Sequence, residues 1–456
     1  MNRRDLIKNA SSLGVATALG AGELKAAGPP PNLLLILTDQ QSHGALSCAG
    51  NPWLKTPAMD SLAATGVRFT EAICPYPVCS PSRSGIFTGR MPHETGVRLN
   101  QGSIPAGMPT MGEIFRQAGY QTVYGGKWHL PKSFEGMTAF DKLAGGSSQG
   151  GDMDGPLASS CAKWLRANPK DPFLMVASFM NPHDICEWIR QHPGAREYAG
   201  IDRYPPVPGN MAVDPREPEF IQYHRNAGYD KMSEAVGLAS AWRRDDVRKY
   251  LHDYYRLVED VDRQIGVVLA ALRETQLDRK TIVVFASDHG EGMGGHRWVQ
   301  KASFYEESVR VPLIVSGPGI QRPGAVDRNS LPSLVDILPT FCDYAGVAVP
   351  KDVRGLSLRP AVEGRPLARK FAVSELLYGG RNREGRMVRT ARHKYVVFNG
   401  GARPEQLFDL TIDPGETQNL ALDRSNAPAL HQHRELLRGW VKETHDDFVS
   451  PVSHHA

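Results

Sequence analysis

The stretch Asn32-Leu33-Leu34-Leu35-Ile36-Leu37-Thr38 is an unbroken apolar run that ends in Asp39-Gln40. A run without polar alternation predicts a strand buried on both faces, as in a parallel sheet covered by helices. Similar apolar segments recur at 122–124, 173–179 and 281–286. Helical patterns lie between them, including the long amphipathic stretch 245–275. This alternation predicts an α/β fold with a largely parallel sheet and helices on both faces.

Each of these four strands is followed by polar residues that bind metals or move protons. They are Asp39 and Gln40, Lys127 and His129, His183 and Asp184, and Asp288 and His289. One such residue alone is usually a turn residue or a helix cap. In open α/β sheets, however, ligands bind beyond the carboxyl ends of the strands. Four such ends together therefore predict one crevice in which these side chains meet.

Two further regions complete the predicted organisation. Residues 187–244 are rich in Pro, Tyr, Arg and Asp without clear periodicity, which predicts an extended excursion at the mouth of the pocket, or one that only packs on the surface. Beyond Pro350, short strands and a terminal helix predict a smaller antiparallel α+β unit: 371–373, 387–390, 394–398 and 428–444. We therefore place a catalytic domain at 28–360 and a C-terminal subdomain at 361–456.

The first 27 residues predict a twin-arginine signal peptide. Arg3-Arg4 precedes a weakly apolar Gly/Ala-rich run that is too short and polar to span a bilayer. The alternative is a frayed N-terminal helix of the fold. The expected partner is the twin-arginine translocase, and the expected location is the periplasm or the medium. About half of the formal net charge of +4 lies in this segment, so the net charge of the rest gives no indication of nucleic-acid binding. Because the run is short and polar, no transmembrane protein is expected.

The segment that begins at Cys79 predicts a short helix with an anion socket at its N-terminus. Pro81 suits a first turn, Gly89 suits the end, and Arg83 lies about one turn inside. Unpaired amides and the helix dipole favour negative charge beside Cys79. The alternatives are a buried cysteine next to a proline turn, or a disulfide with Cys74. Six scattered cysteines are too few for a disulfide scaffold and show no zinc-type spacing.

These residues match a known family signature. Cys79-Ser80-Pro81-Ser82-Arg83, with Thr88-Gly89-Arg90 downstream, resembles the C-x-P-S-R motif of the type I sulfatases. The likeness continues over nearly the whole mature chain, at 125–129, 287–290, 301–313, 407–410 and 413–420. It implies an alkaline phosphatase-like fold, with a large mixed, mostly parallel sheet sandwiched by helices. It also implies that a formylglycine-generating enzyme oxidises Cys79 to formylglycine.

The resemblance implies a bound divalent cation, usually Ca²⁺, with Mg²⁺ as the alternative. Its ligands would be Asp39, Gln40, Asp288, His289 and the modified Cys79. Carboxylate and amide oxygens suit a hard cation. His289 stands where the family often has Asn, and it would touch either the metal or the sulfate.

The resemblance also implies roles for the remaining motif residues. Arg83, Lys127 and Lys301 would help to neutralise the charge of the ester, and the two lysines would hold sulfate oxygens. A hydroxyl of hydrated formylglycine would attack sulfur. His183 would protonate the departing sugar oxygen, and His129 would help to remove a proton from the second hydroxyl so that sulfate leaves.

Four residues near these motifs are expected to contact the substrate: Glu187, Trp188, His296 and Arg297. Capping and core packing are the alternatives for the first two. Many relatives have Pro two residues after the histidine, whereas this chain has Ile185 after His183-Asp184. The resemblance therefore does not define the pocket around His183 or the role of Asp184.

The function expected from these features is an exported sulfatase that acts on a sulfated carbohydrate. A phosphonate or phosphate ester hydrolase with the same modified cysteine is the nearest alternative, because both anions fit such a socket. A non-catalytic glycan-binding protein with unmodified Cys79 is the alternative of another class.

Overall fold

The computed structural model describes residues 29–100, 102–130, 139–143, 151–169, 172–191, 203–227, 231–378 and 383–452. The expected signal peptide lies outside them. The main sheet has the strand order β4-β3-β5-β1-β6-β7-β2-β8. The strands are β1 (Asn32–Asp39), β2 (Gly66–Phe69), β3 (Gln121–Gly126), β4 (Asp141–Lys142), β5 (Phe173–Pro182), β6 (Thr281–Ser287), β7 (Leu313–Ser316) and β8 (Ala325–Asp327).

The apolar run at 32–38 forms β1, the inner strand of this sheet. It pairs in parallel with β5 and β6, so that Leu33 lies opposite both Leu174 and Ile282. β7 runs antiparallel to both β6 and β2, which makes the sheet mixed. The four predicted strands are confirmed as β1, β3, β5 and β6, and β5 extends past the predicted end to Pro182.

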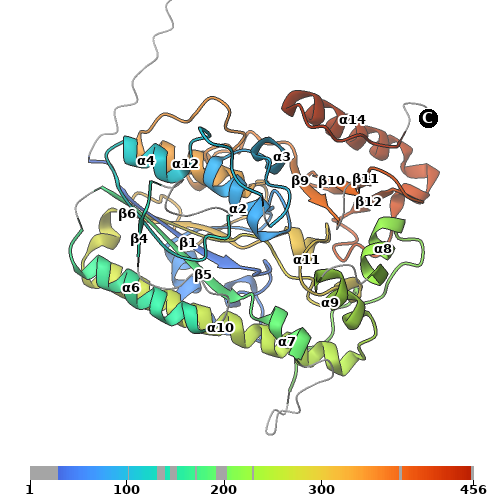
Figure 1. Ribbon diagram of the computed structural model, residues 1–456, viewed down its shortest axis with the longest axis horizontal. Coiled ribbons are helices and arrows are strands. Elements are labelled where there is room, and N and C mark those ends of the chain that lie inside the picture. The colour runs from blue at the N-terminus through green and yellow to red at the C-terminus, as the bar shows by residue number, and fades with distance from the viewer. Residues whose placement is uncertain are drawn as a thin grey trace, which may run out of the picture.

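Helices cover both faces of the sheet, which explains why β1 has no polar side (Figure 1). Leu33, Leu35 and Leu37 enter one hydrophobic core, whereas Leu34 and Ile36 enter the other. The first core lies under α2 (Cys79–Thr88), α4 (Met111–Gln117) and α12 (Ile337–Ala345). The second lies under α1 (Pro57–Thr65), α6 (Asp154–Arg166) and α10 (Arg244–Glu274). The predicted layers are confirmed.

A second sheet of order β12-β11-β10-β9 is antiparallel, as expected of the C-terminal part. Its strands are β9 (Ala372–Leu377), β10 (Glu384–Arg389), β11 (His393–Phe398) and β12 (Glu405–Asp409), and α14 (Ala427–Thr444) packs over it (Figure 1). Leu430 and Leu437 of that helix share a core with Leu407. The domain boundary near residue 360 stays a prediction.

The described parts of 187–244 are more regular than the sequence predicts, and the place of this excursion at the pocket mouth stays a prediction. This region contains α7 (Ile185–Gln191), α8 (Glu219–Ala227) and α9 (Lys231–Ser240). Ile189, Ala235 and Trp242 pack with Tyr250 and Tyr254 of α10 in a separate core. Such short helices gain their stability from tertiary packing more than from their own pattern, which is why the periodicity was weak.

The remaining elements are short. They are α3 (Pro92–Thr95), α11 (Glu306–Val309), α13 (Arg359–Val362), η1 (Ser47–Ala49), η2 (Gly151–Met153), η3 (Leu277–Lys280), η4 (Gly295–Arg297), η5 (Leu334–Asp336), η6 (Leu420–Leu422) and η7 (Arg424–Asn426), where η marks a 3₁₀ helix. Across the described ranges, no helix combines the length and the apolar character needed to cross a membrane.

Candidate active site

Cys79 is the first residue of α2, as the sequence predicts. Val78 before it is extended, and Gly89 ends the helix with a left-handed φ of 67° and an N–H that donates to the Gly85 carbonyl. The Cys79 side chain is fully buried. All six cysteines of the chain lie in described segments and are free, so the alternative of a disulfide between Cys74 and Cys79 is wrong.

Arg83 holds the carboxylates of two separate strand ends. Its Nε lies 2.7 Å from Asp288 Oδ2, just past β6, and its Nη2 lies 3.0 Å from Asp39 Oδ2 at the end of β1. All three side chains are fully buried. Arg83 thus occupies the Oδ2 atoms, while Asp288 Oδ1 accepts from the backbone N–H groups of Gln40 and His289 at 3.2 and 2.9 Å. Asp39 Oδ1 lies 3.6 Å from the Cys79 sulfur.

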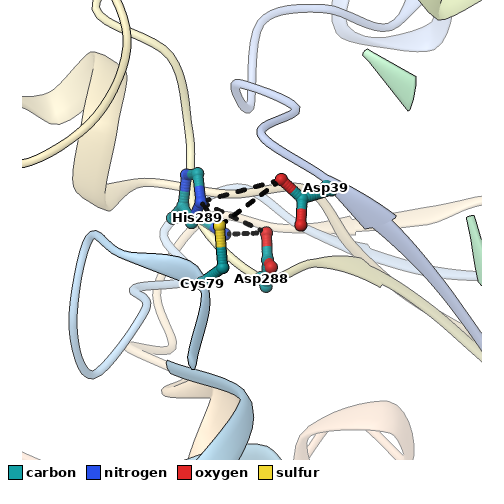
Figure 2. A group of neighbouring side chains, drawn as sticks. All are labelled: Asp39, Cys79, Asp288 and His289. Atoms are coloured by element: carbon teal, nitrogen blue, oxygen red, sulfur yellow. Dashed lines mark hydrogen bonds and ion pairs between the residues drawn. The ribbon is translucent and has the colours of Figure 1, made fainter. Parts of the chain in front are cut away.

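His289 completes a compact group with Cys79 and the two carboxylates. Its Nδ1 lies 2.9 Å from the Gly290 carbonyl, which can only accept, so Nδ1 carries a proton. In the neutral ring Nε2 then has a free lone pair, and it lies 3.1 Å from Cys79 Sγ. Ligand atoms of Asp39, Cys79, Asp288 and His289 all lie within 4.8 Å of one another, and Figure 2 shows the side chains converging.

Gln40 faces the same group through its amide oxygen. Its Nε2 donates to Glu291 Oε2 at 2.6 Å, while its Oε1 accepts from Lys301 Nζ at 3.2 Å. The Tyr254 hydroxyl donates to the Gln40 carbonyl at 2.8 Å and supports a backbone with φ of 69°. Glu291 therefore fixes which end of the Gln40 amide faces the site.

Two buried lysines supply positive charge next to Cys79. Lys301 Nζ lies 3.1 Å from the sulfur, and Lys127 Nζ lies 3.9 Å from it and 2.8 Å from Asp39 Oδ2. Burial opposes ionisation of the Cys79 thiol and of Asp39, but the two ammonium groups hold the pKa of each well below its usual value. For Asp288, burial and the nearby Asp39 charge raise the pKa to about 6. The two ammonium groups therefore favour negative charge at the position of the Cys79 sulfur.

Different contacts place the two predicted histidines. His183 follows β5, and burial together with the charges of Lys127 and Lys301 holds its pKa well below the usual value. The His129 carbonyl accepts from the Ser80 hydroxyl in the first turn of α2. The buried His129 Nδ1 has no hydrogen-bond partner within the described segments.

Other parts of the protein engage three of the four residues expected to contact the substrate. Trp188 is buried, with its ring centroid 5.8 Å from that of Trp242, which assigns it to the core alternative. The Arg297 guanidinium donates to the carbonyls of Ser240 and Trp242 at 2.6 and 3.1 Å, at the end of α9.

His296 is buried against a neighbouring ring. Its imidazole stacks on Tyr305 with centroids 3.7 Å apart. Packing or backbone carbonyls engage Trp188, His296 and Arg297, and their expected contacts with the substrate stay predictions. Glu187 is exposed on α7, and its role stays a prediction.

Sequence reasoning missed two residues that hold the site together. Glu291 orients Gln40 and also accepts from the Tyr250 hydroxyl at 2.6 Å. Ser178 accepts from Arg83 Nη1 and donates to the Lys127 carbonyl, both at 2.8 Å. Ser178 carried one signal, since it is a polar residue within the apolar run 173–179.

Comparisons with known proteins agree with this architecture. A family model described as Sulfatase matches residues 31–347, and one described as N-sulphoglucosamine sulphohydrolase, C-terminal, matches 294–442. The Delta 4,5-hexuronate-2-O-sulfatase of Bacteroides thetaiotaomicron is 34% identical over 445 residues, which cover 92% of this chain and 90% of the relative. A solved structure of a 2-O GAG sulfatase has a TM-score of 0.82 at 32% identity, covering 93% of this chain and 95% of its own.

A phosphonate monoester hydrolase of Agrobacterium radiobacter is also similar, with a TM-score of 0.74 at 25% identity over 91% of this chain and 96% of its own. The Sulfatase model nevertheless spans well over half of the chain, and it covers every strand end that contributes to the site. The chain therefore belongs to the sulfatase family and is a sulfuric ester hydrolase.

Proposed function

We propose that the protein removes sulfate from a sulfated polysaccharide of the glycosaminoglycan type, with position 79 working as formylglycine. The observation that carries the proposal is the placement of Cys79 Sγ 3.1 Å from both Lys301 Nζ and His289 Nε2, and 3.6 Å from Asp39 Oδ1. Cationic donors and metal-type ligands thus surround one buried atom, which is what an attacking group for an anionic ester requires.

The donor set around Cys79 fits a hard divalent cation. Asp39 and Asp288 each offer an Oδ1 that Arg83 does not occupy, and Gln40 offers an amide oxygen that Glu291 holds in place. His289 adds a nitrogen lone pair. Oxygen-rich sites of this kind suit Ca²⁺, with Mg²⁺ as the alternative. When bound, the cation would neutralise sulfate oxygens and make a neighbouring hydroxyl more acidic.

The side chains around that centre divide the remaining work. Lys127 and Lys301 bind sulfate oxygens, because both ammonium groups face the position of the Cys79 sulfur. His183 donates a proton to the departing sugar oxygen; a bound sulfate would offset the lysine charges that disfavour its protonated form. His129 accepts a proton at position 79. Formylglycine, when hydrated, supplies one hydroxyl to attack sulfur and a second whose deprotonation expels sulfate.

Maturation and location follow from the same proposal. A formylglycine-generating enzyme would act on Cys79 before the chain folds, because the folded side chain is fully buried. The twin-arginine pattern at Arg3-Arg4 supports export to the periplasm or the medium, where sulfated polysaccharides are met.

The substrate class is tested by sulfate release from defined compounds. The first substrate is an unsaturated disaccharide with a 2-O-sulfated hexuronate, because the relative at 34% identity is named for that activity. Matched disaccharides sulfated only at amino-sugar positions, an aryl sulfate and an aryl phosphonate complete the set. The proposal predicts that a sulfated disaccharide has the highest kcat/KM. Phosphonate turnover faster by orders of magnitude would instead establish the phosphonate hydrolase alternative.

The glycan-binding alternative predicts tight association with these disaccharides without any sulfate release. The two buried lysines beside Cys79 and the nearby His183 argue against it, because a binding protein needs no proton carrier at that atom.

A further inference from the structure

Two cavities adjoin on the β2 side of the main sheet, outside the site described above. The first has a volume of about 330 Å³ and the second of about 460 Å³. They share Glu71, Arg310 and Arg328 in their walls, so they meet along those residues. Arg68 lines only the first, and Arg389 only the second. We call the two adjoining cavities together the hollow, and four arginines line it.

Two of these arginines are neutralised by carboxylates in the same walls. Glu71 Oε1 lies 2.9 Å from Arg310 Nη2, and its Oε2 lies 2.5 Å from Arg389 Nη2. Glu306 lies 3.6 Å from Arg310 Nη1 and 3.4 Å from Arg389 Nε. These contacts use both acidic side chains of the hollow.

The other two arginines carry surplus charge. The side chains of Arg68 and Arg328 form no hydrogen bond and no ion pair with any residue that the structure describes. Arg68 is half-buried on β2, opposite Val326 of β8, and Arg328 directly follows β8. Two guanidinium groups on neighbouring strands repel each other when alone. An oxyanion offsets that repulsion and accepts their planar pairs of N–H donors.

The hollow lies next to the active site. β2 runs parallel to β1, because β7 is antiparallel to both β2 and β6, and its end at Phe69 is therefore at the same sheet edge as Asp39. Three strand spacings separate β1 from β2, or about 14 Å at about 4.8 Å each. The segment 306–311 borders both places: the Ser308 carbonyl accepts from Gly290 N, while Arg310 lines the hollow.

We propose that the hollow is a second binding site for an anionic group, a sulfate or a carboxylate, on the same sulfated chain whose ester is cleaved at Cys79. This inference rests on the proposed polysaccharide substrate. A polyanion that reaches from the active site to Arg68 and Arg328 gains two charge-assisted contacts that a short substrate cannot reach. Chain length, rather than the identity of the terminal sugar, is therefore what the hollow recognises.

Binding is measured in a Cys79→Ala background, so that nothing is consumed. A sulfated glycosaminoglycan hexasaccharide and the matching disaccharide are titrated by calorimetry into this protein and into a version that also carries Arg68→Ala and Arg328→Ala. We expect the hexasaccharide to bind about tenfold more weakly to the latter, and the disaccharide to bind equally well to both. The affinity of the protein with both arginine changes for the hexasaccharide should also depend less on salt concentration.

Matched variants keep the outcome interpretable. Arg328→Ala alone, at an exposed position, should give part of the loss, whereas Arg424→Ala, another exposed arginine with no ion pair in the described chain, should give none. Unchanged hexasaccharide affinity, or an equal loss for the disaccharide, would overturn the proposal. If the two arginine changes weaken the binding of inorganic sulfate but not that of the hexasaccharide, the hollow takes a free anion and the glycan assignment is overturned. If the hexasaccharide does not bind even the Cys79→Ala protein, the proposed substrate class itself fails.

Discussion

At the residue scale, the site depends on side chains that fix the orientation of other side chains. Arg83 takes one oxygen from each of two carboxylates, and Glu291 takes the amide nitrogen of Gln40. In each case the remaining oxygen is directed at the group around Cys79. Outer contacts of this kind usually change metal affinity tenfold to a hundredfold when they are removed.

Glu291→Gln should therefore weaken Ca²⁺ binding at least about tenfold, because the new amide no longer dictates which end of Gln40 faces the site. Calcium titration of chelator-treated protein by calorimetry measures this, apart from any effect on turnover. The exposed Glu187→Gln is the control and should bind Ca²⁺ as the wild type does. An unchanged Kd in Glu291→Gln would show that Gln40 is not held by this contact.

At the element scale, α2 must begin and end at fixed points for Cys79 to reach the two strand ends. Gly89 ends it in a left-handed conformation that other residues adopt only with strain. A Cβ at this position would also come within 2.8 Å of Val353 Cγ1. The helix end is therefore set by glycine rather than by a polar cap.

Gly89→Ala should lower the free energy of unfolding by about 1–3 kcal/mol, from backbone strain and overpacking together. Gly439→Ala is the matched change, because Gly439 lies inside α14 with nothing within 4 Å of an added Cβ. It should raise stability by about 0.5–1 kcal/mol. Urea unfolding of both proteins checks the pair, and equal effects at the two positions would contradict this account of the helix end.

At the scale of the whole molecule, His93 of α3 ties the main fold to the C-terminal sheet and helix. Its Nδ1 lies 2.6 Å from Glu375 Oε1 of β9, and its Nε2 lies 3.2 Å from the Thr444 carbonyl at the end of α14. Only the protonated ring donates at both nitrogens. Burial opposes the charge, but the hydrogen bond that His93 donates to Glu375 raises the pKa of His93 above the usual 6.5.

This raised pKa predicts a pH-dependent stability. The contribution of His93 is fully present below the unfolded pKa of about 6.5, and it is lost as the pH rises through the higher folded value. His93→Gln should be less stable than the wild type at low pH, and the difference should shrink as the pH rises through that range. Urea midpoints over a pH series measure it. A difference that grows with pH would contradict the assignment of a protonated His93.

The sequence predicted the centre of the molecule better than its periphery. β1 and β6 are continuous apolar runs, and the polar residues that follow them meet because parallel strands end at one edge. The short β7 at Leu313–Ser316 and the helices near Trp188 were not predicted, since their stability comes from neighbours distant in sequence. The left-handed φ values of 50° at His296 and 54° at Arg297 were not predicted either, and they accompany a turn that places His296 on Tyr305 and Arg297 on the Ser240 carbonyl.

The proposed mechanism needs an aldehyde, made from cysteine, at position 79. Peptide mass spectrometry of active enzyme, purified from the exporting host, measures this directly on the fragment that contains Cys79. We expect a lighter peptide, in which an aldehyde replaces the thiol-bearing carbon. The fraction of this modified peptide should rise in proportion to the sulfate released, and Cys79→Ala should release none. Full activity from protein whose Cys79 is an unmodified thiol, or turnover by Cys79→Ala, would contradict it.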